Sequence, residues 1–179
     1  VTPRAGKAVE LNALWINGLA VVASLCERLG RDGSPVRALE SQARSSFPGA
    51  FVRDGWCRDL VGDPRLRPNQ LLAASLPHAP LAGRSVVGSC APLLTSLGLR
   101  SLAPGDPAYS GRHRGGPAER DHAYHQGTAW PWLLGPFVEA WLRVRGGDDK
   151  ARAEASARFL APLRAHLGVG GTELQRLVV

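Results

Sequence analysis

Residues 120–141, RDHAYHQGTAWPWLLGPFVEAW, join a cluster of polar and aromatic side chains to an apolar run. The apolar part predicts a buried helix over 129–145, in which Pro131 is tolerated near the start and Gly135-Pro136 should produce a kink. In the polar part, aromatic rings can cover the C–H faces of sugar rings, while carboxylate, amide and imidazole groups bond their hydroxyls. A core helix needs no such polar groups, so this stretch predicts a carbohydrate site at the mouth of a buried helix.

The same combination of a buried helix followed by an amphipathic helix recurs along the chain. The expected pairs are 7–30 with 35–47, 68–76 with 82–95, and 129–145 with 149–167. The helix over 7–30 is apolar nearly all round and should therefore be buried on every side. Each partner has one apolar and one charged face, which is typical of an outer, half-exposed helix.

About three such hairpins with long loops indicate an all-α fold, a partial (α/α)6 toroid in which an inner ring of helices is wrapped by an outer ring. A closed toroid has six hairpins, so this chain supplies about half. Residues 1–167 are assigned to the toroid domain, and 168–179 to a divergent C-terminal tail. A Gly/Pro-rich loop is expected over 103–120, and short strands near 55–60 and 99–102.

Polar residues gather where the three inner helices begin: Glu10 in the first, Asn69 in the second, and Asp121 to Trp132 in the third. Helix N-termini present unpaired N–H groups and a partial positive charge. Their convergence predicts a polar cup above an apolar barrel, which is the main argument for a binding site.

Several residues of this group have a purely structural interpretation as well. Glu10 also suits a first-turn acid favoured by the helix dipole, and Asn69 suits a local cap, with neither alternative preferred. Trp15 is interpreted more readily as a core residue and Asp106 as a turn former. For His125 the site interpretation is favoured, because a core histidine rarely has so many polar neighbours.

Other functional classes receive little support from the sequence. The net charge of +7 arises from scattered basic residues, with no Lys/Arg block, so a nucleic-acid interface is not indicated. No metal-ligand spacing, dinucleotide or P-loop motif, or serine-hydrolase motif occurs, and we expect no metal and no cofactor.

Cysteine usage and hydropathy bear on the compartment. The three cysteines are widely spaced and include no CxxC pair, which fits a reducing environment, and Cys26 and Cys90 are interpreted as small core residues. Polar residues interrupt the apolar run over 11–26, which is interpreted as a buried helix and not as a membrane span. No signal peptide is recognised, so a cytoplasmic protein without membrane association is expected.

Three segments carry distinctive strings in a fixed order: VTPRAGKAVELNALWINGL (1–19), RLRPNQLLAASLPHAP (65–80) and GLRSLAPGDPAYSGRHRGGPAERDHAYHQGTAWPWLLGPFVEAWLR (98–143). They resemble the C-terminal glucosidase domain of glycogen debranching enzymes, the amylo-α-1,6-glucosidase family. The resemblance covers nearly the whole chain up to about residue 167. TPRAGKAVE, RPNQ, RSLAP and AYHQGTAWPW are its most specific parts.

The resemblance implies an α/α toroid that hydrolyses α-1,6 branch stubs of glycogen or a related branched α-glucan. Two carboxylates would act as general acid and general base, and an inverting pair would stand about 6.5–9.5 Å apart to admit a water. The resemblance also implies a set of substrate contacts: Glu10, Trp15, Asn69, Asp121, Tyr124, His125, Gln126 and Trp130.

The sequence departs from the family pattern at both catalytic positions. The acid carboxylate of the family lies in a Trp-Met-Asp segment before the TPR string, whereas this sequence starts at Val1. The second lies in a Ser-Glu-Ile-Phe-Asp-like segment, where residues 168–179 read GVGGTELQRLVV and Glu173 has unmatched neighbours. Residues 49–60 are also shorter than in the family. We therefore expect a truncated, catalytically incomplete fragment with no catalytic residue of its own.

Three other interpretations stay open. The chain can be a non-catalytic α-glucan-binding remnant that keeps the aromatic and amide wall. It can be a helical interaction module for nucleic acid, which requires a one-sided basic stripe that the sequence does not show. It can also be a poorly folded product whose exposed inner helices self-associate or bind a partner.

Overall fold

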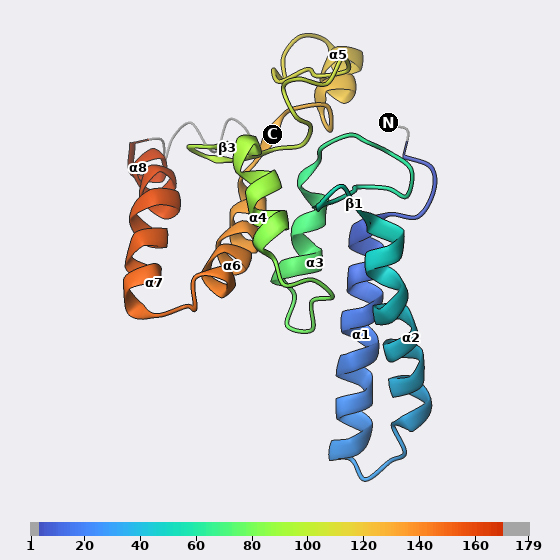
Figure 1. Ribbon diagram of the computed structural model, residues 1–179. Helices are drawn as coiled ribbons and strands as arrows, with labels where there is room; N and C mark the ends of the chain where they lie inside the picture. The colour runs from blue at the N-terminus through green and yellow to red at the C-terminus, as the bar shows by residue number, and fades with distance from the viewer. Residues whose placement is uncertain (1–3, 170–179) are drawn as a thin grey trace.

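The computed structural model describes residues 4–169, which are mostly helical, so the expected all-α class is confirmed (Figure 1). The expected tail over 168–179 lies outside the described residues from position 170 onward. The described elements occur in this order: α1 Val9–Arg28, α2 Ser34–Phe51, β1 Val52–Arg53, β2 Trp56–Cys57, η1 Pro68–Leu71, α3 Leu72–Ser75, α4 Arg84–Cys90, η2 Ala91–Leu93, β3 Leu94–Thr95, β4 Gly98–Arg100, α5 Pro117–Ala123, β5 Ala129–Trp130, η3 Pro131–Leu133, α6 Leu134–Val144, α7 Asp149–Ala155, the π-helical η4 Ser156–Leu160, and α8 Ala161–Val169.

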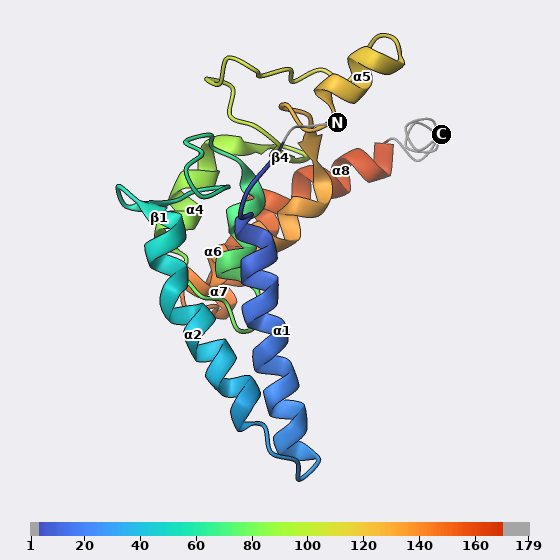
Figure 2. The same cartoon turned by 90° about the vertical axis from the view of Figure 1, so that its right-hand side faces the viewer.

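The first hairpin is built from the two longest described helices, which lie side by side in both ribbon views (Figures 1 and 2). Helix α2 begins with Pro35 in its first turn, where a missing N–H costs nothing. It continues past the expected end at 47 and through Pro48. The buried rings of Phe47 and Phe51, with centroids 4.7 Å apart, hold this last turn in the core.

Helix α1 is not buried on every side, so that prediction was wrong. One face packs on α2, α3 and η1, while a large set of apolar side chains on the other face is exposed: Leu11, Leu14, Trp15, Val21, Val22, Leu25 and Leu29. The core interpretation of Trp15 is also wrong, since the residue is 58% exposed. The apolar composition of α1 predicts that all its faces pack against other elements, but the described residues pack against one face only.

By length and composition α1 would also be able to cross a bilayer, a test that the core helix of a soluble protein passes equally. Along one side it bears three polar side chains, Glu10, Asn17 and Ser24, that bond within the chain, Glu10 to Arg4. The Asn17 Oδ1 accepts a hydrogen bond from the His78 N–H, and the Ser24 Oγ accepts one from Arg37. α1 is thereby fixed to α2 and to the segment after α3.

Helix α6 begins at Leu134, five residues later than the expected start at 129. Residues 129–133 instead form β5 and η3. Gly135-Pro136 consequently falls in the first turn of α6, where proline is accommodated, and the expected kink within a longer helix does not arise. The outer helix over 149–167 is confirmed as the run α7, η4 and α8, and its Phe159 ring packs edge-on against Phe137 at 5.3 Å.

Two small antiparallel sheets decorate the loops, close to where strands were expected. β1 and β2 are joined by Asp54 and Gly55, both with positive φ, as a two-residue hairpin turn requires. β3, β4 and β5 form a three-stranded sheet in which Leu99 pairs with Trp130. This second sheet attaches the segment before α6 to the middle of the chain.

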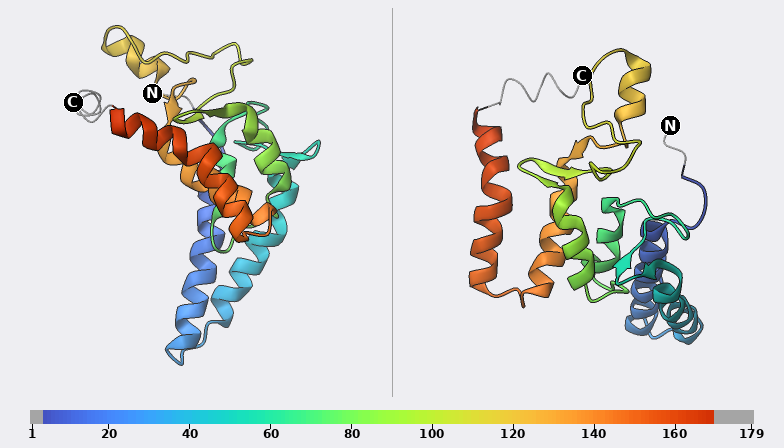
Figure 3. Two further views of the ribbon diagram at one scale, coloured as in Figure 1. Left: turned by 90° about the vertical axis from the view of Figure 1, so that its left-hand side faces the viewer. Right: turned by 45° about the horizontal axis from the view of Figure 1, so that its top comes forward.

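The inner helices are neighbours: α1 contacts α3, and α3 contacts α6. Figures 1 and 3 show α7–α8, α6, α4, α3, α1 and α2 following one another across the molecule, with α5 and the loops at one end. This order of the helices agrees with the expectation that each hairpin pairs an inner helix with an outer one. The closed toroid stays a prediction.

Candidate functional site

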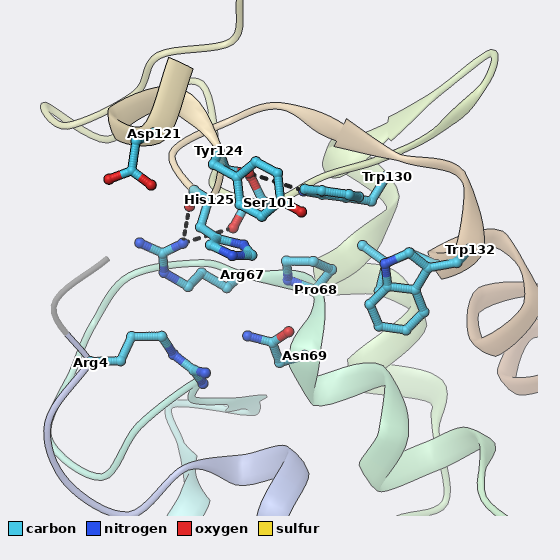
Figure 4. Close-up of a pocket in the computed structure, with 11 residues that line it drawn as sticks. Arg4, Arg67, Pro68, Asn69, Ser101, Asp121, Tyr124, His125, Trp130 and Trp132 are labelled. Atoms are coloured by element: carbon cyan, nitrogen blue, oxygen red, sulfur yellow. Dashed lines mark hydrogen bonds between the residues drawn. The ribbon is translucent and has the colours of Figure 1, made fainter. Parts of the chain in front are cut away.

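A cavity of about 650 Å³ lies at the end of the molecule where the inner helices begin. Four separate parts of the chain form it: the segment before α1, η1, the end of β4, and the stretch from α5 to η3 (Figure 4). Its lining comprises Arg4, Arg67, Pro68, Asn69, Ser101, Asp121, Tyr124, His125, Trp130, Trp132 and Leu133.

One wall of the cavity is aromatic and internally packed. The Tyr124 ring lies edge-on to His125 and to Trp130, with centroids 4.6 Å away in both cases. His125 and Trp130 are nearly parallel at 5.9 Å, and the Trp130 indole N–H donates to the Tyr124 carbonyl at 3.1 Å. These contacts fix the ring planes before any ligand arrives. Trp132 stands at the edge and is 59% exposed.

Arg67 fastens this wall to the start of η1. Arg67 is only 2% exposed. Its guanidinium donates hydrogen bonds to the Ser101 carbonyl at 3.0 Å, to the His125 carbonyl, and to the Gln126 Oε1 at 2.7 Å. The Ser101 hydroxyl in turn accepts from the Gly127 N–H at 2.9 Å. One side chain therefore links η1, the end of β4 and the turn after α5.

The opposite side of the cavity depends on a buried carboxylate. Asp59 is 1% exposed and accepts hydrogen bonds from the Arg4 Nε at 3.0 Å and the Asn69 Nδ2 at 2.8 Å. Burial raises the pKa of the Asp59 carboxyl, while the bonds from Arg4 and Asn69 act against that rise. Arg4 also donates hydrogen bonds to both carboxylate oxygens of Glu10, at 2.7 and 2.9 Å. Glu10 therefore does not line the cavity itself but holds Arg4, which does.

The structure brings together five of the eight expected contacts on the cavity surface: Asn69, Asp121, Tyr124, His125 and Trp130. Glu10 and Gln126 stand behind the lining, bonded to Arg4 and Arg67 respectively. Trp15 belongs to the exposed face of α1 and does not line the cavity. The substrate role of all eight stays a prediction.

The sequence-based prediction missed Arg4 and Asp59. It included Trp132 in the polar and aromatic cluster but not among the substrate contacts, and it named Arg67 only as part of the segment that opens the second inner helix. Asp59 gave a usable signal, since a single acid within an apolar strand-like segment is costly unless it is paired. Arg4 and Arg67 gave none, because their partners lie far away in sequence. The interpretation of Asp106 as a turn former agrees with its carboxylate, which accepts from the Ala108 N–H at 2.8 Å.

The chemistry of this arrangement is hydrogen bonding and ring stacking. Among residues 4–169 there is no group of three or more His, Cys, Asp or Glu side chains suited to a metal ion. The guanidinium and amide groups of Arg4, Arg67 and Asn69 face the aromatic rings across the cavity, and the Asp121 carboxylate lies on the same side as the rings (Figure 4). Such a pairing suits a neutral, hydroxyl-rich ligand with apolar ring faces.

His125 gives the wall a pH dependence. Burial lowers the pKa of its imidazole below the usual 6.5, and the charges of Arg67 and Arg4 lower it further. The unfolded chain then binds this proton more tightly, so the stability that His125 contributes is present above its unfolded pKa and is lost as pH falls through the folded pKa. We expect acidification below pH 6.5 to destabilise the wild type more steeply than His125→Gln in urea denaturation. Parallel pH profiles for the two proteins would contradict this expectation.

Comparison with known proteins supplies the lineage. The family model described as amylo-alpha-1,6-glucosidase matches residues 1–173, which include the whole cavity lining. No curated protein matches the chain significantly. The chain therefore belongs to the amylo-alpha-1,6-glucosidase family, whose function is related to glycogen debranching.

Proposed function

We propose that the cavity binds a glucosyl unit of a branched α-glucan such as glycogen, at the end of an α-1,6-linked stub. The observation that supports this proposal is the union, in one cavity of about 650 Å³, of an aromatic wall and a row of polar side chains. A pyranose ring has the same two-sided character, with apolar C–H faces and an equator of hydroxyls.

In this proposal the sugar lies with a ring face against Trp132, at the edge of the aromatic wall. Its hydroxyls bond to Asn69 and Asp121, which lie on the polar part of the lining. Asn69 is held by Asp59 through its Nδ2, which leaves its carbonyl oxygen as an acceptor. Asp59 thus acts as a positioning residue that orients Asn69 and Arg4.

We further propose that this chain by itself binds glucan without hydrolysing it. Glycosidic hydrolysis requires two carboxyl groups on either side of the scissile bond. Among the described residues, Asp121 is the carboxylate on the cavity surface. Asp59 is enclosed, and Glu10 is held on both oxygens by Arg4, so neither is presented to a bound sugar.

Two exposed tryptophans provide a matched test of binding. Trp132, at the cavity edge, and Trp15, on α1, are 59% and 58% exposed, so replacing either one by alanine leaves the core intact. We expect Trp132→Ala to weaken binding of a phosphorylase limit dextrin about 30-fold, because in this proposal the sugar ring lies against this side chain. Trp15→Ala should bind as the wild type does. Isothermal titration calorimetry measures both.

The same preparations test catalysis. Glucose release from limit dextrin by the purified chain should equal the buffer background. Release that exceeds this background and disappears in Asp121→Asn would show that a carboxylate of this chain performs hydrolysis. Equal affinities for the wild type and Trp132→Ala would place the glucan elsewhere on the molecule.

A further inference from the structure

Tyr109 belongs to the loop between β4 and α5 and does not line the cavity. Successive turns hold its backbone, because the Asp106 N–H donates to the Ala103 carbonyl at 3.0 Å and the Tyr109 N–H donates to the Asp106 carbonyl at 2.9 Å. The Ala103 N–H in turn donates to the Leu66 carbonyl at 3.1 Å, next to Arg67 in sequence. This part of the loop is therefore fixed to the body of the chain.

The Tyr109 ring lies against two glycines. A Cβ added at Gly127 would stand 2.5 Å from the Tyr109 Cε2 and 2.7 Å from its Cδ2. A Cβ added at Gly111 would overlap the other edge of the ring, at the hydroxyl, Cζ and Cε1. Only residues without a side chain leave this space to the ring. The Arg100 Nε donates to the Tyr109 hydroxyl at 3.0 Å, which fixes the far end of the ring.

The loop contacts the turn that follows His125 of the aromatic wall. Gly127 in this turn is buried and has a φ of +135°. The Gln126 carbonyl accepts a hydrogen bond from the Ser110 N–H, next to the tyrosine. Displacement of the tyrosine ring would leave Gly127 without its packing partner, and glycine has the widest choice of backbone conformations. The placement of His125 then depends on the ring.

We propose that Tyr109 is a positioning residue for glucan binding, which acts by fixing the turn at residues 125–127. Arg67 holds the same turn from η1, through the His125 carbonyl and the Gln126 Oε1. The tyrosine does not contact the sugar. It limits the movement of the aromatic wall before the sugar arrives, so less conformational entropy is lost on binding. This inference rests on the glucan site proposed above.

Calorimetry with limit dextrin tests the role of the ring. Tyr109→Ala should raise the dissociation constant about 10-fold, because the wall must then be ordered when the sugar binds. Tyr109→Phe keeps the ring and removes only the hydroxyl, whose partner Arg100 is half-buried and can bond to water instead. The phenylalanine variant should therefore bind within about two-fold of the wild type.

Two glycine variants in the same loop form a matched pair. Gly111→Ala adds a methyl group where the ring lies, so it should push the ring from its place and weaken binding about 10-fold. Gly105→Ala adds a methyl group where nothing lies within 4 Å, and it should bind as the wild type does. Both glycines are exposed and neither has a positive φ, so both variants keep their fold, which circular dichroism checks.

Amide hydrogen exchange tests the same role without a ligand. The Gly127 N–H donates to the Ser101 Oγ at 2.9 Å, so its exchange reports how often the turn opens. Exchange of this amide should accelerate at least about 10-fold in Tyr109→Ala and in Gly111→Ala. It should stay unchanged in the phenylalanine variant and in Gly105→Ala. A tyrosine that stabilised only its own loop would leave this amide as it is in the wild type.

Three results would overturn the proposal. The first is wild-type affinity, or unchanged exchange at Gly127, in Tyr109→Ala. The second is binding by Tyr109→Phe as weak as that by the alanine variant, which would assign the role to the hydroxyl. The third is an equal loss in Gly105→Ala and Gly111→Ala, which would assign it to the loop backbone. If the wild type binds no limit dextrin, the glucan site is refuted, and hydrogen exchange still shows whether the ring holds the turn.

Discussion

Replacing Arg67 by methionine is expected to lower the free energy of unfolding by about 4 kcal/mol and to abolish glucan binding. The guanidinium is fully enclosed and serves three acceptors, namely the Ser101 and His125 carbonyls and the Gln126 amide oxygen. Methionine fills much of the volume but leaves these buried acceptors unpaired, and each costs about 1–3 kcal/mol. Urea denaturation gives the stability change, and calorimetry with limit dextrin gives the binding.

Two further variants separate the causes. Arg67→Lys keeps the charge but loses the planar fork, so we expect an intermediate loss of about 2 kcal/mol. Arg158→Met removes an arginine of η4 that is 54% exposed and pairs with Glu154 on the surface, and it should change stability by less than about 1 kcal/mol. Similar losses for Arg67→Met and Arg158→Met would refute the structural role assigned to Arg67.

Gly98→Ala is expected to have the second-largest effect. A Cβ at this position would lie 2.5 Å from the backbone carbon and oxygen of Trp130 and 2.8 Å from the Pro131 nitrogen. Backbone cannot move aside as a flexible side chain does, so β5 must separate from β4. We expect a loss of about 3 kcal/mol and weaker glucan binding, because Trp130 moves with its strand.

Gly88→Ala in α4 is the control for this substitution. A Cβ at Gly88 meets nothing within 4 Å, and the residue lies within a helix, where alanine is favoured by about 0.5–1 kcal/mol. The two glycine variants should therefore change thermal stability in opposite directions. Stabilisation by both would mean that β4 and β5 pair less closely than the structure indicates.

Much of the architecture could be predicted from apolar periodicity. The repeated succession of an apolar helix and an amphipathic one determined the class and the order of the hairpins, and it located α2 and the run from α7 to α8. Periodicity failed where a local feature had more influence. Trp130 and Pro131 were assigned to a helix, but pairing of Trp130 with Leu99 draws this segment into a sheet.

The exposure of one face of α1 could not be predicted from the sequence, for a different reason. A sequence shows which faces are apolar, but it does not show what covers them. Trp15 and Leu25 have the composition of core residues and nevertheless lie in the open. Their environment depends on which other helices pack against α1, and the sequence pattern of α1 does not specify those helices.

The cavity was predicted in outline through residues that neighbour one another in sequence, Asp121 to Trp130. Its supporting side chains were not, because Arg67 and Asp59 act on partners from other segments. A buried arginine has no local signature, since its sequence neighbours do not reveal which carbonyls it will serve. Charged residues in apolar surroundings are the best available indication of such supports.

The reach of Arg67 has a consequence for the order of folding. Its three bonds join residues 34, 58 and 59 positions apart, whereas α1 and α2 are connected by a short turn. Closing a long stretch of chain lowers its conformational entropy before the contacts that offset this loss are made. The α1–α2 hairpin is therefore expected to form early and the cavity late. A partly folded chain would thus expose the apolar face of α1 while it lacks the ligand cavity. Saturating sugar binds only the fully folded chain and would shift the population toward it.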